Sequence, residues 1–267
     1  MKVDFMVIGA ARSATTSLSS LLALHPEICF STPKEPQFFS QDNWRNSLEE
    51  YHTLFKNEAK LYGEGSTNYS KYPHFNKNIF NDIFEYNPDM KFIYMMRNPI
   101  DRIISHYKLA IERGYASEDI NAEVLQKPIY IDTSKYFYQI SPYIELFGSK
   151  NIKLVLFEEY INSHQNVLNK VFDFLGVSRI DISSKYAVIN QSQAGTITHE
   201  KYDYPSSLLK KILKGFHVLS RRLKPVTIDI SLNEETKQKL ISELSEDIKN
   251  LETLINKDLS HWLLKQE

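Results

Sequence analysis

The sequence contains little cysteine and almost no net charge. Its 267 residues include one cysteine, Cys29, which excludes an internal disulfide framework and a metal site built from several cysteines. A chain that forms no internal disulfide is typical of a reducing compartment. The formal net charge is −1, so the chain as a whole does not attract nucleic acid, and any basic site has to be local.

Long apolar segments are missing as well. A helix that spans a bilayer takes about 20 consecutive apolar residues, and no run in this sequence approaches that length. The short N-terminal run 5–8 follows Asp4 and does not have the pattern of a signal peptide. We therefore expect a cytoplasmic protein, or one that contacts a membrane only peripherally.

The sequence also lacks internal repeats, low-complexity tracts and glycine-serine linkers. A chain of this length suits one α/β domain. We therefore expect a single domain over residues 1–267, with an α/β core in residues 1–176 and a late loop with C-terminal helices in residues 177–267.

What the sequence does contain is an alternation of strand-like and helix-like segments. Short apolar runs predict strands, and apolar residues at helical spacing between them predict helices. The expected strands are 5–8, 28–30, 61–62, 91–96 and 152–157. The expected helices are 15–22, 48–55, 75–86, 100–112, 136–146 and 167–175. This order predicts a three-layer α/β fold, in which helices cover both faces of a central, mainly parallel sheet, followed by a helical C-terminal part.

Polar turns follow three of the expected strands, after residues 8, 62 and 96. Because the carboxyl ends of parallel strands lie at one edge of a sheet, we expect these turns to meet there, where such sheets bind ligands. The first turn belongs to a P-loop-like strand, loop and helix start. That arrangement offers backbone N–H groups and the positive end of a helix dipole to an anion.

The first turn matches the phosphate-binding template G-x-x-x-x-G-K-[ST] only in part. Gly9 and Thr16 fit the first glycine and the final hydroxyl. Ala14 replaces the second glycine and Thr15 replaces the lysine, so the one cation of the loop is Arg12. The turn is therefore expected to bind an anion in a different way from a Walker-type loop.

A P-loop kinase or NTPase that uses Mg-ATP is the first alternative. Such an enzyme also places an aspartate for Mg²⁺ after a second strand. The expected strand 91–96 is followed by Arg97 instead. This departure disfavours Mg-ATP as the ligand.

Two motifs in this frame resemble those of sulfotransferases that use 3′-phosphoadenosine 5′-phosphosulfate (PAPS) as donor. The segment 12–18, RSATTSL, looks like the family's 5′-phosphosulfate-binding loop, and Arg97 with Ser105 eight residues later resembles its 3′-phosphate signature. Three more segments are similar to parts of the heparan-sulfate-type branch or to the family's closing helix and tryptophan: 34–39, 63–69 and 247–262. The similar segments follow the family's order over most of the chain.

The resemblance implies a nucleotide-binding core with PAPS as the sulfuryl donor, 3′-phosphoadenosine 5′-phosphate (PAP) as the product and no metal. The residues that it assigns to the donor are Arg12, Ser13, Ala14, Thr15, Thr16, Ser17, Arg97 and Ser105. The late loop lacks the basic, glycine-rich run of many relatives, and its only candidates are Gly195, His199 and Lys201. The competing interpretation of Arg97 is a surface ion pair with Asp101.

The resemblance also implies catalytic roles for three residues. Sulfuryl transfer resembles phosphoryl transfer in depending mainly on positioning and charge stabilisation. In the family's scheme Arg12 neutralises charge on the leaving nucleotide and Glu64 takes the proton of the acceptor. Lys34 resembles a lysine that lines the catalytic centre, although an ion pair with Glu35 would also explain it.

The choice of Glu64 as general base depends on its place in the motif. It lies between Gly63 and Gly65, where we expect a substrate to approach closely. A histidine serves as base in the branch of the family that acts on small phenols. The competing candidates here are His106 and His74.

The methyl group of Ala14 stands where the family has glycine, so a catalytically silent nucleotide-binding protein is a second alternative. For an active enzyme we expect the acceptor to be a hydroxyl, or an amine, of a carbohydrate, lipid or small molecule, with no nucleic acid partner. The segment 206–223 carries an apolar helical face opposite lysines and arginines. It fits either a packed helix or a helix that lies on an anionic membrane.

Overall fold

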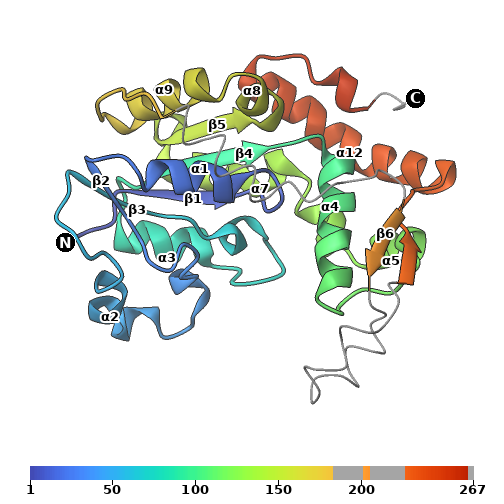
Figure 1. The fold of residues 1–267 in the computed structure, drawn as a ribbon, viewed down its shortest axis with the longest axis horizontal. Helices are drawn as coiled ribbons and strands as arrows, with labels where there is room; N and C mark the ends of the chain where they lie inside the picture. Colours follow the sequence, from blue (N-terminus) through green and yellow to red (C-terminus); the bar gives the residue numbers. More distant parts are fainter. Residues whose placement is uncertain (183–200, 205–225, 264–267) are drawn as a thin grey trace.

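A parallel sheet forms the centre of the protein. The computed structural model describes residues 1–182, 201–204 and 226–263. The central sheet has five strands, all parallel, in the order β2-β3-β1-β4-β5 (Figure 1). They are β1 (Phe5–Gly9), β2 (Ile28–Phe30), β3 (Leu61–Glu64), β4 (Lys91–Met96) and β5 (Ile152–Leu156).

Helices cover both faces of this sheet, which confirms the predicted three-layer α/β fold. Successive residues of a strand point to opposite faces, so Phe5 and Val7 of β1 join one core while Met6 and Ile8 join the other. The first core is covered by α1 (Thr15–Leu22), α8 (Phe157–Asn162) and α9 (His164–Leu175). The second is covered by α3 (Ile79–Tyr86), α4 (Pro99–Glu112), α7 (Tyr136–Phe147) and α12 (Glu234–Ile255).

The turn from β4 into α4 is fixed by local chemistry. Asn98 is the N-cap residue, and its side-chain oxygen accepts from the amides of Ile100 at 3.0 Å and Asp101 at 3.3 Å. Pro99 occupies the first helical position, where a missing N–H group does no harm. The cap therefore holds Arg97 at the carboxyl end of the sheet.

The C-terminal helix supports this turn from outside the sheet. The carboxylate of Asp247 in α12 accepts from the amides of Phe137 at 3.0 Å and Tyr138 at 2.8 Å, at the start of α7. The buried ring of Trp262 packs edge-on against Tyr136, with the ring centroids 5.9 Å apart. The hydroxyl of Tyr136 donates to the carbonyl of Arg97 at 2.7 Å. The closing segment thus stabilises the position of the strand end.

The structure differs from the sequence-based expectation mainly in short elements. Two helices expected over 48–55 and 75–86 are shorter, namely α2 (Leu48–His52) and α3, which begins only at Ile79. Elements that were not expected are α5 (Ile120–Gln126), α6 (Ile129–Asp132), α8, which begins at the expected strand residue Phe157, and a two-stranded antiparallel sheet of β6 (Lys201–Tyr204) and β7 (Val226–Asp229). The described residues also form short 3₁₀ turns: η1 (Phe38–Ser40), η2 (Trp44–Asn46), η3 (Thr67–Ser70), η4 (Ser149–Asn151) and η6 (Ser260–Trp262). Such short elements depend on tertiary packing more than on local sequence.

Among the helices in the described part of the chain, none combines the length and the apolar character that crossing a bilayer requires.

Candidate functional site

The loop between β1 and α1 turns sharply into the first helix. Arg12 has a φ angle of 76° and Ala14 one of 63°, both in the left-handed region. Ala14 is the N-cap residue of α1, and within the described residues no side chain caps this helix. The first amides of a helix have no intrahelical acceptor. The N–H groups of residues 15–17 therefore have no intrahelical acceptor, and their binding of an anion stays a prediction.

The side chains of this loop point in different directions. Arg12 and Thr16 are exposed at the surface. The hydroxyl oxygen of Ser13 is buried, and no described group forms a hydrogen bond with it. The hydroxyl of Ser17 lies 2.9 Å from the hydroxyl of Tyr160 in α8. Either hydroxyl of this pair can be the donor, and the contact fixes the side chain of Ser17 against α8.

The loop and helix α4 are joined by a direct hydrogen bond. The Nε atom of Arg12 donates to the Oγ atom of Ser105 at 2.9 Å. The two residues are 93 positions apart in the sequence and belong to the two motifs that were expected to hold the two ends of the donor. Tertiary structure thus brings the 5′ and 3′ motifs together.

Arg97 lies nearby in the chain, at the end of β4. Its NH2 atom is 3.5 Å from a carboxylate oxygen of Asp101, so the ion pair of the competing interpretation is present. The guanidinium group also lies over the ring of Phe157, 4.9 Å from its centroid. Its Nε atom is buried, and no acceptor for it is found among the described residues. The ion pair therefore does not use the full donor capacity of Arg97.

Glu64 is the last residue of β3 and is fully buried. One carboxylate oxygen, Oε1, accepts from the hydroxyls of Tyr69 at 2.9 Å and Tyr51 at 3.1 Å. The other, Oε2, accepts from Ser66 at 2.6 Å. Burial raises the pKa of Glu64 to about 7, against the lowering effect of the bonds from Ser66, Tyr69 and Tyr51. A carboxyl group that ionises near neutral pH fits a general base.

The glycines beside Glu64 serve packing, which corrects our expectation that they let a substrate approach. A Cβ atom on Gly63 would lie 2.1 Å from the ring of Phe5 in β1. A Cβ atom on Gly65 would lie 2.9 Å from the hydroxyl of Ser19 in α1. The carboxyl group itself has no exposed surface. An acceptor hydroxyl can therefore reach it only after a neighbouring group moves.

Segments 34–39 and 63–69, predicted as separate motifs, form one connected structure. The amide of Gly65 donates to the carbonyl of Lys34 at 3.1 Å, and the amide of Gln37 donates to the hydroxyl of Ser66 at 3.0 Å. The ammonium group of Lys34 is 2.7 Å from the carboxylate of Glu35. The structure therefore shows for Lys34 the ion pair that was its competing interpretation, close to Gly65.

The two competing histidines are both engaged elsewhere. His106 lies on α4, where its Nδ1 atom is 3.4 Å from the guanidinium group of Arg102. Burial, followed by the positive charges of Arg102, Lys71 and Arg12, lowers the pKa of His106 to about 2. His74 pairs with Asp132 at 2.8 Å. A histidine that stays neutral at such low pH is a weak base, so the structure favours Glu64.

The sequence analysis missed Arg102. This side chain is fully buried and donates to the hydroxyl of Ser134 and to the carbonyl of Tyr130, both at 2.7 Å. Its position three residues before Ser105 on one helix was the available signal, because residues at that spacing share a face. Together with Arg12 and Lys71 it makes the surroundings of His106 electropositive, which favours an anionic ligand.

The remaining predicted residues fall in the late part of the chain. Gly195 and His199 lie outside the described residues, as does the segment 206–223. Lys201 is the first residue of β6, and only its backbone is described. The assignment of these three residues to the nucleotide stays a prediction.

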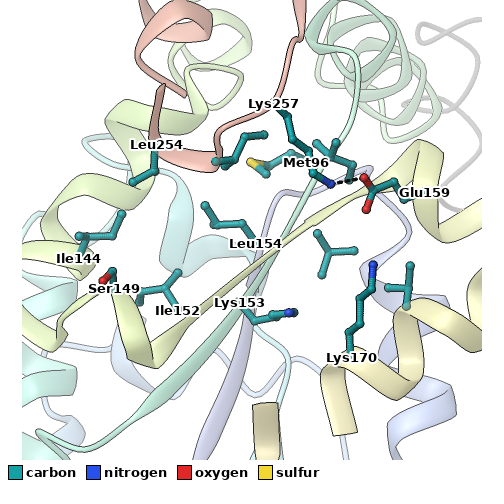
Figure 2. A pocket seen from close by; sticks show the side chains of 14 residues that line it. Met96, Ile144, Ser149, Ile152, Lys153, Leu154, Glu159, Lys170, Leu254 and Lys257 are labelled. Atoms are coloured by element: carbon teal, nitrogen blue, oxygen red, sulfur yellow. Dashed lines mark hydrogen bonds and ion pairs between the residues drawn. The ribbon is translucent and has the colours of Figure 1, made fainter. Parts of the chain in front are cut away.

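A cavity of about 350 Å³ opens beside the edge strand β5, apart from these residues (Figure 2). Its lining comes from β5, with further residues from β4, α7, η4, α8, α9 and the end of α12, and it includes none of the predicted site residues that the structure describes. Its rim carries an ion pair between Lys257 and Glu159. Across residues 1–182, 201–204 and 226–263, no cluster of three histidine, cysteine or carboxylate side chains suited to a metal is found.

Comparison with known proteins gives one consistent result. The family model for the sulfotransferase domain matches residues 2–211. The bifunctional heparan sulfate N-deacetylase/N-sulfotransferase 1 of Caenorhabditis briggsae is 23% identical over 195 residues, which cover 64% of this chain and 22% of that protein. The human heparan sulfate glucosamine 3-O-sulfotransferase 6 is 22% identical over 198 residues, with 70% of this chain and 56% of that protein covered. The chain thus spans between about a fifth and a half of the length of these relatives.

Two solved structures share the fold. A sulfotransferase from Alicyclobacillus acidocaldarius superposes with a TM-score of 0.68 at 24% identity, covering 98% of this chain and 99% of that one. Mouse sulfotransferase SULT7A1, solved in complex with PAP, superposes with a TM-score of 0.52 at 18% identity and covers 74% of this chain and 68% of that one. The first of these matches extends the fold likeness over nearly the whole chain.

Proposed function

The chain belongs to the sulfotransferase domain family, and from this premise we propose that it transfers a sulfuryl group from PAPS to a hydroxyl group of an acceptor. The observation that carries the proposal is the hydrogen bond between Arg12 and Ser105, which joins the two anion-binding motifs at the carboxyl end of the sheet. Glu64 ends β3, whose neighbour in the sheet is β1, so the candidate base belongs to the same edge.

The residues at this edge suit a donor with two anionic groups. The amides of residues 15–17 and the side chain of Arg12 would hold the 5′ end of PAPS, and Arg97 with Ser105 would hold its 3′-phosphate. The buried Ser13 hydroxyl and the Nε atom of Arg97, for which the described residues supply no partner, fit oxygens of such a ligand. Donors fixed in this way bind phosphate oxygens well, because charge-assisted hydrogen bonds are the strong ones.

When bound, PAPS supplies the sulfuryl group and leaves as PAP, as the acceptor oxygen bonds to sulfur and the bond from sulfur to the bridging oxygen breaks. Arg12 would neutralise the negative charge that develops on the bridging phosphate oxygen as its bond to sulfur breaks. The part of Glu64 is to take the acceptor's proton, and its pKa of about 7 suits that task near neutral pH. Lys34 would add positive charge near the reacting groups. To do so, its ammonium group would exchange its ion pair with Glu35 for the substrate.

The acceptor that we favour is a hydroxyl of a carbohydrate. Support comes from segments 34–39 and 63–69, which resemble the heparan-sulfate-type branch and are hydrogen-bonded to each other around Glu64. The names of both curated relatives refer to heparan sulfate. A hydroxyl of a lipid or a small molecule is the second acceptor class, because acceptor pockets are built from variable loops.

Two further proposals concern location. A cytoplasmic site of action and a peripheral membrane contact through residues 206–223 both rest on sequence alone. Sedimentation with neutral and with anionic vesicles tests the second, since an electrostatic contact requires preference for the anionic ones.

Transfer of labelled sulfate from PAPS to a panel of glycans, lipids and phenols tests the function. We expect a product with at least one carbohydrate, and we expect Glu64→Gln to remove the transfer while PAP still binds. Failure of the unaltered chain to label any of these acceptors, with PAP bound tightly, would instead support a catalytically silent nucleotide-binding protein.

The family match lends no support to the Mg-ATP alternative. Calorimetry with PAP and with ATP, each with and without Mg²⁺, separates the two ligands directly. A preference for Mg-ATP would overturn the proposed donor.

A further inference from the structure

Three hydroxyl groups from different parts of the chain meet at the carboxylate of Glu64. Tyr51 comes from α2, Tyr69 from η3, and Ser66 from the turn after β3. All three side chains are buried. We call Tyr51, Tyr69 and Ser66 the hydroxyl cage.

For Ser66 and Tyr69, two of the three cage residues, the neighbouring hydrogen bonds indicate that the hydroxyl proton is donated to Glu64. The hydroxyl oxygen of Ser66 already accepts from the amide of Gln37 at 3.0 Å, and that of Tyr69 accepts from the amide of Phe39 at 3.2 Å. A hydroxyl oxygen that accepts from an amide still has its own proton to donate to a second acceptor within reach. That acceptor is Glu64, so the carboxylate form is the one that the cage stabilises.

Packing holds the third member in place. The ring of Tyr51 stacks on Phe38, with centroids 4.0 Å apart and an interplanar angle of 5°. Its hydroxyl therefore has little freedom to turn away from Glu64. The cage supplies two donors to Oε1 and one to Oε2. A carboxylate oxygen can accept two such bonds, so Oε2 keeps capacity for an incoming proton.

We propose that Tyr51, Tyr69 and Ser66 are positioning residues of the sulfuryl transfer, whose hydrogen bonds to Glu64 favour its carboxylate form and fix its orientation. This inference rests on the proposed function, in which Glu64 is the general base. Without the cage, burial would hold this carboxyl group protonated at neutral pH, and a protonated carboxyl group takes no proton from an acceptor.

The balance between burial and hydrogen bonding supports this assignment. Burial is the largest influence on the pKa of Glu64 and raises it, whereas the bonds from Ser66, Tyr69 and Tyr51 lower it. Removing a donor that favours the charged form raises the pKa of an acid. Each cage variant should therefore need a higher pH to ionise Glu64.

The variants Tyr51→Phe, Tyr69→Phe and Ser66→Ala test the proposal with two readouts. The first is the pKa of Glu64 from the ¹³C chemical shift of its side-chain carboxyl carbon, assigned by comparison with Glu64→Gln. The second is the pH profile of kcat with PAPS and a carbohydrate acceptor. We expect both the titration and the acid limb of the profile to move to higher pH by about one unit in each variant, with kcat recovering as the pH rises.

Matched controls remove hydroxyls that do not contact Glu64. Tyr107→Phe deletes a buried hydroxyl that donates to the carbonyl of Ser117 at 2.9 Å. Ser70→Ala deletes one in η3 itself, which donates to the carbonyl of Ile8 at 2.6 Å. Both controls should leave the titration of Glu64 unchanged, even where they lower thermal stability.

The outcomes distinguish a failure of the hydroxyl-cage proposal from a failure of Glu64 as the general base. An unchanged pKa of Glu64 in all three cage variants overturns the cage, whatever the activity. Full activity of Glu64→Gln overturns the base, and with it the catalytic meaning of any shift in titration. A loss of activity in cage variants that is equal at every pH would point to a structural role and also count against the proposal.

Discussion

The Nε atom of Arg12 donates a hydrogen bond to the Oγ atom of Ser105 at 2.9 Å. This contact connects the loop after β1 to helix α4 and so joins two segments that lie 93 residues apart. Because both side chains belong to predicted phosphate-binding motifs, a change in one should alter donor binding by the other.

Ser105→Ala is expected to weaken PAP binding by about tenfold, since it removes one hydrogen bond to an anion and one constraint on Arg12. Isothermal titration calorimetry measures the effect. Ser141→Ala is a suitable control, because that hydroxyl donates within its own helix to the carbonyl of Phe137. Equal affinities for the Ser105 variant and the unaltered chain would contradict a role at the 3′-phosphate.

Arg12→Ala is expected to lower kcat by about a hundredfold or more, because a positioned charge at the leaving group is lost. Arg12→Lys should retain part of the rate, since it keeps the charge but not the forked donor geometry. Steady-state kinetics with PAPS measures both. Arg179→Ala removes an exposed arginine that pairs with Asp173 and should leave kcat unchanged. A rate for Arg12→Ala close to that control would refute the assignment.

The raised pKa of Glu64 predicts a cost in stability as the pH rises. Its pKa is about 7 in the folded chain and 4.5 ordinarily, so the folded state binds the proton more tightly than the unfolded state. The contribution of this group to the free energy of unfolding is therefore fully present below pH 4.5. It falls by about 3 kcal/mol as the pH rises through 7. We expect the unaltered chain to lose more unfolding free energy than Glu64→Gln between pH 5 and pH 8. If urea unfolding shows equal losses of unfolding free energy for the two chains, burial does not raise the pKa of this carboxyl group.

Ala14→Gly is expected to stabilise the chain by up to about 1 kcal/mol, because it relieves an alanine held at a φ angle of 63°. PAP binding should be at least as tight as before. Ala23→Gly is the matched control, and it should lower the free energy of unfolding. Ala23 ends the same helix at a φ angle of −65°, so it has no strain for glycine to relieve. Destabilisation by Ala14→Gly would mean that the packing of its methyl group outweighs the strain.

Much of the fold follows from local pattern. The expected strand 91–96 coincides with β4, and the expected helix 100–112 differs from α4 only by including Pro99 at its start. Both are long or fully buried elements, in which apolar periodicity is strong. The short helices α5 and α6 left no such signal, because a few residues cannot hold a helix without neighbours to pack against.

The candidate site was predictable where its residues lie in motifs close along the chain. The loop after β1 and the turn after β4 follow from the sequence, whereas Glu64, expected in the turn after a strand 61–62, is the last residue of β3. The contact of Tyr51 with Glu64 did not follow from the sequence, because Tyr51 lies in a separate helix, and the sequence predicted only that a helix forms over 48–55. The burial of Glu64 was missed for the same reason, since exposure depends on what folds over a side chain.

The sequence by itself determined the alternation of strands and helices, the anion-binding loop and the order of the family's motifs, because these depend on residue types at short spacings. Only the tertiary structure decided that Arg12 bonds to Ser105, that Gly63 is required by the ring of Phe5, and that three hydroxyls enclose Glu64. Such contacts arise from the packing of elements distant in sequence, and that packing sets the ionisation of a buried carboxyl group.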